Sequence, residues 1–190
     1  MHTCEWFLLD DEGIFCFVVT LRNPPLYNTR LNRTRMTKTG KAIVIYDTLF
    51  GNTEKIAKAL ASGIREQGVE VDCIKASEVD INKLVGYDLL AVGGPTQAFG
   101  TSKPMKDFLG RLEGVELRGK NAFAFDTKVR FIFTGSAAKG IEGRLRKLGM
   151  KIARSYASAI VKGNEGPLEE GEEEMFKQIG TELSRSIQST

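Results

Sequence analysis

The chain has 190 residues, 42% apolar and 27% charged, a composition typical of a globular domain with a sizeable core. Its formal net charge of +3 is too small to indicate nucleic-acid binding by itself. Three widely spaced cysteines without a C-x-x-C motif favour a reducing compartment, so we expect a cytoplasmic protein, and the only histidine, His2, argues against a His-based triad or a His-rich metal site.

Residues 1–37 differ in character from the rest of the chain. Two apolar runs surround a DDEG turn, which predicts a hairpin, and a polar, proline-containing linker follows. The longest apolar run, IFCFVV, is far shorter than the ~20 residues of a membrane helix, and the acids before it do not fit a secretory signal. We interpret residues 1–37 as an N-terminal extension, either a hairpin arm or a mis-called gene start, with a partner-binding hairpin as the alternative. Residues 38–190 then form the working domain.

Strand and helix patterns alternate from residue 41 onward. The apolar runs predict strands at 41–47, 69–74, 88–94, 121–126 and 158–163. Helical spacing predicts helices at 52–67, 102–112, 137–148 and 168–188, with a short helical connection at 80–86. Five strands alternating with helices predict a parallel sheet with right-handed crossovers and helices on both faces. The expected fold class is therefore α/β, a three-layer doubly wound five-stranded sheet.

The loop after the first predicted strand carries an unusual set of polar residues. Ligands of such sheets bind beyond the carboxyl ends of the strands, so the loops after strands one, three and four are the candidates. In YDTLFGNTEKIA (46–57), the hydroxyl and amide side chains of Thr48, Asn52 and Thr53 surround the start of a helix, and Gly51 permits close backbone approach. This arrangement suits a phosphate monoester, whereas simple helix capping by Thr48 or Asn52 is the structural alternative.

The same stretch resembles the signature of the flavodoxin family. That signature is a hydrophobic pair, an aromatic residue, a hydroxyl, a small residue, a threonine, an alanine and an aliphatic residue at fixed spacing, met here by Val44, Ile45, Tyr46, Thr48, Gly51, Thr53, Ala57 and Leu60. The resemblance covers about residues 41–188. It implies the strand order 2-1-3-4-5 and the cofactor flavin mononucleotide (FMN), with the phosphate held by the loop residues Thr48, Leu49, Phe50, Gly51, Asn52 and Thr53.

The loop after the third strand, 93–104, is similar to the family's stretch along the inner face of the isoalloxazine ring. Pro95 and Thr96 match the common Pro-Thr pair, but Gln97 stands where many flavodoxins have an aromatic residue. Phe99, followed by Gly100, either covers the ring or anchors the loop in the core.

The resemblance implies that the loop after the fourth strand meets the pyrimidine edge of the flavin. Asp126, Thr127 and Lys128 stand where backbone groups would contact that edge. The stacking tyrosine of the family is absent, and Phe131 or Phe133 is the nearest substitute, unless VRFIF (129–133) simply extends the strand.

The loop after the fourth strand also carries two cations that could change the redox potential of the flavin. Lys128 or Arg130, if close to the ring, would stabilise the negatively charged reduced flavin. Ser136 is expected to cap the helix that follows.

Three functional classes remain open from sequence. The resemblance favours an FMN-binding electron carrier that works with redox partner proteins and with neither nucleic acid nor membrane. The alternatives are an NAD(P)H-dependent quinone or flavin reductase on the same fold, and a scaffold domain that has lost FMN.

Overall fold

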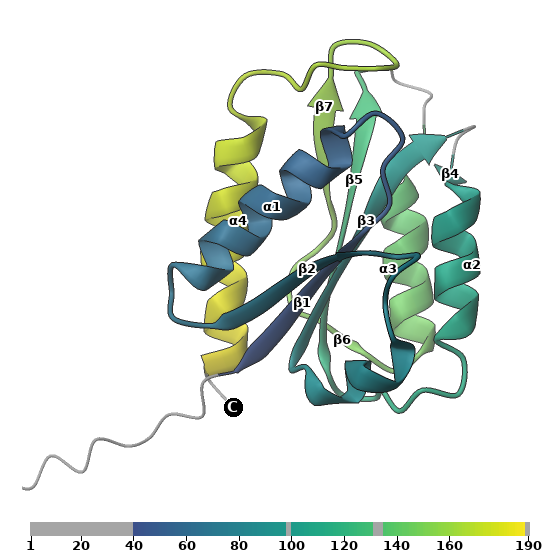
Figure 1. Cartoon of the computed structure of the whole chain (residues 1–190), viewed down its shortest axis with the longest axis vertical. Coiled ribbons are helices and arrows are strands. Elements are labelled where there is room, and N and C mark those ends of the chain that lie inside the picture. Colours follow the sequence, from purple (N-terminus) through teal and green to yellow (C-terminus); the bar gives the residue numbers. More distant parts are fainter. Residues whose placement is uncertain (1–39, 98–99, 131–134, 189–190) are drawn as a thin grey trace, which may run out of the picture. The chain divides into compact units, whose positions relative to one another are not determined.

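The computed structural model describes residues 40–97, 100–130 and 135–188 (Figure 1). No helix within these ranges is long and apolar enough to cross a membrane. The strands are β1 (Lys41–Tyr46), β2 (Glu70–Lys75), β3 (Leu89–Gln97), β4 (Gly100–Thr101), β5 (Asn121–Val129), β6 (Lys151–Ile152) and β7 (Ala157–Val161). The helices are α1 (Asn52–Arg65), η1 (Ile81–Gly86), α2 (Lys103–Arg111), α3 (Ala137–Lys147) and α4 (Glu172–Gln188). The predicted N-terminal extension, residues 1–37, lies outside the described residues.

The principal strands form one parallel sheet. β1 pairs with β2 on one side and β3 on the other, and β5 pairs with β3. The edge next to β5 is formed in two pieces, because β6 pairs with the start of β5 and β7 with its end. Between these pieces, the amide of Tyr156 donates to the carboxylate of Glu142 at 2.9 Å. The predicted order 2-1-3-4-5 is confirmed, with a divided fifth strand.

Three element boundaries differ from the sequence prediction by at least three residues. β3 continues to Gln97 rather than ending at residue 94. β5 continues to Val129 rather than ending at residue 126. Of the stretch 129–133 that the alternative assigned to the strand, only Val129 is in β5, Arg130 lies beyond its end, and residues 131–133 lie outside the described residues. The last helix begins at Glu172 rather than at residue 168, because Leu168 still pairs with Val161 in an antiparallel bridge.

The sheet is buried on both faces by helices. On β1, Val44 and Tyr46 join the core beneath α1 and α4, whereas Ile43 and Ile45 join the core beneath α2 and α3. Figure 1 shows the two helix pairs on opposite sides of the sheet. This alternation explains why the strands are continuous apolar runs in the sequence.

Helices α1 and α4 approach each other through two glycines. A Cβ added to Gly63 would lie 1.9 Å from the carbonyl oxygen of Lys177, and one added to Gly180 would lie 2.2 Å from that of Leu60. Both obstructing atoms belong to the backbone, so a change of rotamer cannot relieve the clash. The two helices therefore pack almost backbone to backbone, which fixes α1 and its first turn over the sheet.

We predict that Gly63→Ala lowers the free energy of unfolding by about 1–3 kcal/mol, because α1 and α4 must separate to admit the methyl group. Urea denaturation of the full-length chain measures this change. Gly143→Ala is the matched control, since Gly143 is an exposed residue of α3 with no atom within 4 Å of an added Cβ. That control should raise the stability by about 0.5–1 kcal/mol through helix propensity. Wild-type stability in Gly63→Ala would contradict the close helix packing.

Candidate functional site

The loop between β1 and α1 is closed by a hydrogen bond of its own. The hydroxyl oxygen of Thr48 accepts from the amide of Gly51 at 2.9 Å. Gly51 precedes α1 with a φ of 83°, in the left-handed region that favours glycine, and it provides no side-chain cap. The structural alternative, in which Thr48 or Asn52 caps the helix, is therefore not what the loop does.

The first turn of α1 consequently keeps free hydrogen-bond donors. Within the described part of the chain, the amides of Asn52, Thr53 and Glu54 have no acceptor. The carboxylate of Glu54 does not fold back onto them, because it pairs with Lys58 at 2.6 Å. With the helix dipole added, this turn attracts an anion.

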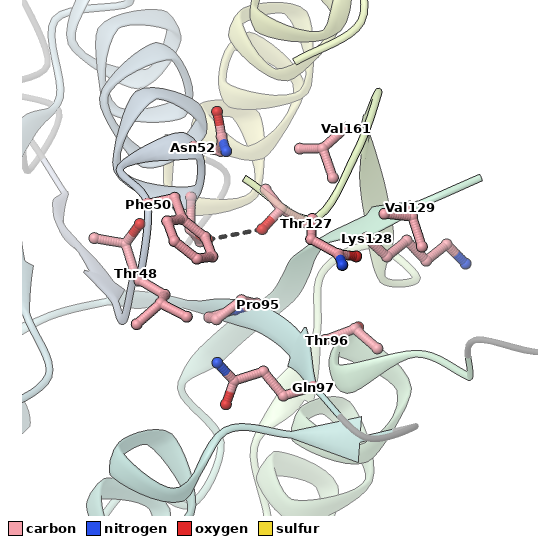
Figure 2. Close-up of a pocket in the computed structure, with 13 residues that line it drawn as sticks. Thr48, Phe50, Asn52, Pro95, Thr96, Gln97, Thr127, Lys128, Val129 and Val161 are labelled. Atoms are coloured by element: carbon pink, nitrogen blue, oxygen red, sulfur yellow. Dashed lines mark hydrogen bonds between the residues drawn. The ribbon is translucent and has the colours of Figure 1, made fainter. Parts of the chain in front are cut away.

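A pocket of about 410 Å³ opens at this edge of the sheet (Figure 2). Its described lining contains no carboxylate and a single charged residue, Lys128. Ten of the predicted site residues line it, namely Thr48, Leu49, Phe50, Asn52, Thr53, Pro95, Thr96, Gln97, Thr127 and Lys128. The three loops chosen from the sequence therefore meet at one pocket.

Four predicted site residues do not line the described pocket. Gly51 shapes the first loop, and Gly100 lies in β4, where it pairs with Gln97. Phe99 lies outside the described residues, as do Phe131 and Phe133, so their contacts with a ring stay predictions. The fourth residue, Asp126, has a different role.

The side chain of Asp126 is fully buried beside the start of α3. One carboxylate oxygen accepts from the hydroxyls of Thr96 and Ser136 and from the amide of Ala138, at 2.8–3.0 Å. The hydroxyl of Thr96 in turn accepts from the amide of Ala137 at 2.9 Å. Asp126 thus ties the pocket strand β3 to α3, and its other carboxylate oxygen, Oδ1, is buried with no partner among the described residues. The predicted cap by Ser136 is present, since its hydroxyl accepts from the amide of Lys139 at 3.2 Å.

Two buried hydroxyls join the first turn of α1 to β5. The side-chain oxygens of Thr53 and Thr127 lie 2.8 Å apart, and the residues are only 1% and 5% exposed. Both line the pocket, and the bond between them is the dashed line of Figure 2.

The sequence interpretation missed the loop after β7. Val161 and Asn164 line the pocket together with Val129. The side-chain amide of Asn52 donates to the carbonyl of Glu165 at 2.8 Å, so this loop is fastened to the start of α1. The turn-forming residues 163–167 (GNEGP) follow the fifth parallel strand. A loop in that position is a candidate ligand site in such a sheet, and this was the sequence signal that could have identified it.

Two apolar side chains stay exposed at the pocket. Leu49 is 63% exposed and Phe50 49% exposed, although both are large. Figure 2 shows the ring of Phe50 between Thr48 and Thr127, above Pro95 in this view. Such side chains would gain free energy if a flat apolar group covered them.

The two predicted cations have separate positions. Arg130 is not part of the described lining, because its guanidinium forms a two-bond ion pair with the carboxylate of Glu169. Lys128 lines the pocket, and Figure 2 shows its side chain extending away from Thr127.

The described ranges offer no rival chemistry of metals or thiols. They contain no group of three His, Cys, Asp or Glu side chains that could hold a metal ion. Cys73 is a free thiol on β2, and burial raises its pKa to about 11, so the reactive thiolate is scarce at neutral pH.

Comparison with known proteins agrees with this geometry. The family model described as Flavodoxin matches residues 44–179. The chain is 35% identical over 165 residues to Flavodoxin of Aquifex aeolicus (strain VF5). The aligned region covers 78% of this chain and 87% of that protein. A solved structure described as a flavodoxin from the domain Archaea has a TM-score of 0.68 at 26% identity, covering 77% of this chain and 98% of that one.

Other similarities are more limited in extent. The chain is 31% identical over 119 residues to NAD(P)H dehydrogenase (quinone) of Methylocella silvestris, covering 52% of this chain and 58% of that protein. Further relatives are longer proteins, of whose length the chain spans 25% to 32%.

Proposed function

The chain belongs to the flavodoxin family of FMN-binding electron-transfer proteins, and on this premise we propose that it carries electrons between redox partner proteins with FMN in the pocket of Figure 2. The observation that carries this proposal is the first turn of α1. Its free amides, the absence of carboxylates from the described lining and the glycine at position 51 fit a phosphate monoester.

The remaining lining fits the other parts of FMN. A pocket of about 410 Å³ lies in the usual range of about 300–1,000 Å³ for small-molecule sites. Leu49, Phe50 and Pro95 offer apolar contact to the ring from one side, and Val129 and Val161 line the other part. The exposed side chains of Leu49 and Phe50 support this assignment, since a bound ring would remove apolar area from water.

The protein supplies the environment of the redox centre. FMN, when bound, accepts and returns electrons at its isoalloxazine ring. Lys128 is the one charged residue of the described lining, and although its side chain extends away from Thr127, attraction from its ammonium group would favour the negatively charged reduced flavin. Arg130 is held by Glu169 and should contribute little. Of the two cations named from the sequence, we therefore assign the tuning role to Lys128.

A reductase on the same fold is the second candidate function. It is favoured by the partial match to an NAD(P)H dehydrogenase (quinone). The carrier is preferred because the match to Flavodoxin of Aquifex aeolicus covers 87% of that protein, against 58% for the reductase. We also propose a cytoplasmic location, supported by the free thiol of Cys73.

We expect FMN-loaded protein to oxidise NADH and NADPH negligibly when no partner reductase is present. Absorbance of the nicotinamide in anaerobic and aerobic assays measures this, with and without a quinone as acceptor. Addition of a generic flavodoxin reductase should start electron flow into the bound flavin. Steady nicotinamide oxidation by the isolated protein would replace the carrier with the reductase.

We predict that Lys128→Ala lowers the midpoint potential for forming reduced FMN, because an attractive positive charge is lost. The side chain is partly exposed, so the change should correspond to less than about 1 kcal/mol. Redox titration with reference dyes measures the potential. Arg130→Ala is the matched control and should leave it unchanged. Equal potentials in wild type and Lys128→Ala, or a larger effect from Arg130→Ala, would contradict the assignment.

A further inference from the structure

Thr53 and Thr127 form an isolated pair of hydroxyls in the wall of the pocket. Their oxygens lie 2.8 Å apart, and either atom could be the donor. Thr53 belongs to the first turn of α1, whereas Thr127 lies on β5, so the pair joins two elements that are far apart in sequence.

A count of hydroxyl protons shows that the pair lacks one hydrogen-bond acceptor. Two hydroxyls carry two protons, and the bond between them uses one. Neither oxygen has another hydrogen-bond partner within the described part of the chain, so one proton is left over. Both residues are at least nine-tenths buried and both line the pocket, so a ligand in the pocket is the available acceptor. A donor left buried without an acceptor would cost free energy.

The position of the pair identifies the acceptor. Thr53 is the second residue of α1, and its neighbours supply the free amides that attract an anion. An acceptor reached from this turn is an anionic oxygen rather than the apolar ring.

We propose that Thr127 belongs to the phosphate-binding site. There it and Thr53 act as one unit that donates a single hydrogen bond to the phosphate. This inference rests on the proposed function. The family resemblance implied only that backbone groups at Thr127 contact the pyrimidine edge, and this inference adds a role for its side chain at the phosphate end of the pocket. It also makes Thr127 a determinant of selectivity for phosphorylated over unphosphorylated flavin.

Unit behaviour has a measurable consequence. If Thr127 orients the hydroxyl of Thr53, loss of either hydroxyl disrupts the same donor, and the two losses are not independent. If the pair only holds α1 against β5, its loss weakens the binding of every ligand and also lowers the free energy of unfolding.

The test is a double-mutant cycle in full-length protein, with FMN and riboflavin as probes. The variants are Thr53→Val, Thr127→Val and both together, and flavin fluorescence gives the dissociation constants. We expect each single variant to weaken FMN by about 5- to 10-fold, and the double variant to be little worse than either. Riboflavin, which lacks the phosphate, should bind all variants equally.

Three further variants separate the proposed role from a general loss of folding. Thr181→Val is the control, because the hydroxyl of Thr181 bonds backbone carbonyls of α1 and α4 away from the pocket, and it should change neither ligand. Thr127→Ser keeps the hydroxyl and should retain FMN selectivity, whereas Thr127→Ala should reduce that selectivity by about 5- to 10-fold, as expected for Thr127→Val. This Ser and Ala pair decides the question if Thr127→Val does not fold.

The outcomes separate the two levels of inference. Unchanged FMN affinity in Thr127→Val, equal weakening of FMN and riboflavin, or multiplicative losses in the double variant would overturn the role of Thr127 while the proposed function stands. Wild-type protein that binds neither flavin would overturn both.

Discussion

The unpaired amides at the start of α1 are the constraint around which this molecule is built. A helix of this length leaves its first N–H groups without partners, and most helices satisfy them with a side-chain cap. Here the obvious cap, Thr48, bonds the amide of Gly51 instead. The donors of Asn52 and Thr53 are thereby kept for an external acceptor, and the turn becomes a binding site for an anionic oxygen.

The rest of the fold holds that turn in place. Gly63 and Gly180 bring α4 against α1, so the helix is fixed along its length. Asn52 fastens the loop after β7 over the same turn. The buried carboxylate of Asp126 then connects β3 and β5 to the start of α3 beneath the pocket. These contacts come from distant parts of the sequence and orient the binding groups before a ligand arrives.

How much could be predicted from the sequence depends on how far apart along the chain the interacting residues lie. The alternation of strands and helices depends on local apolar spacing, so the elements and the sheet order were predicted with small boundary errors. The first loop was identified because its donors are neighbours in the chain. The bonds of Asp126 and the Thr53–Thr127 pair were not foreseen, because they join residues that only the folded sheet brings together. The helix boundary at Glu172 was missed for the same reason, since the bridge of Leu168 to Val161 delays it.

Phosphorus NMR of bound FMN tests most directly whether the first turn of α1 holds the phosphate. A free phosphate monoester takes up a proton with a pKa of about 6. Free amide donors and the helix dipole favour the dianion, so the resonance of bound FMN should stay constant from pH 8 down to about pH 5. A bound resonance that titrates like free FMN would show that the phosphate lies in water, and would contradict a phosphate site at this turn.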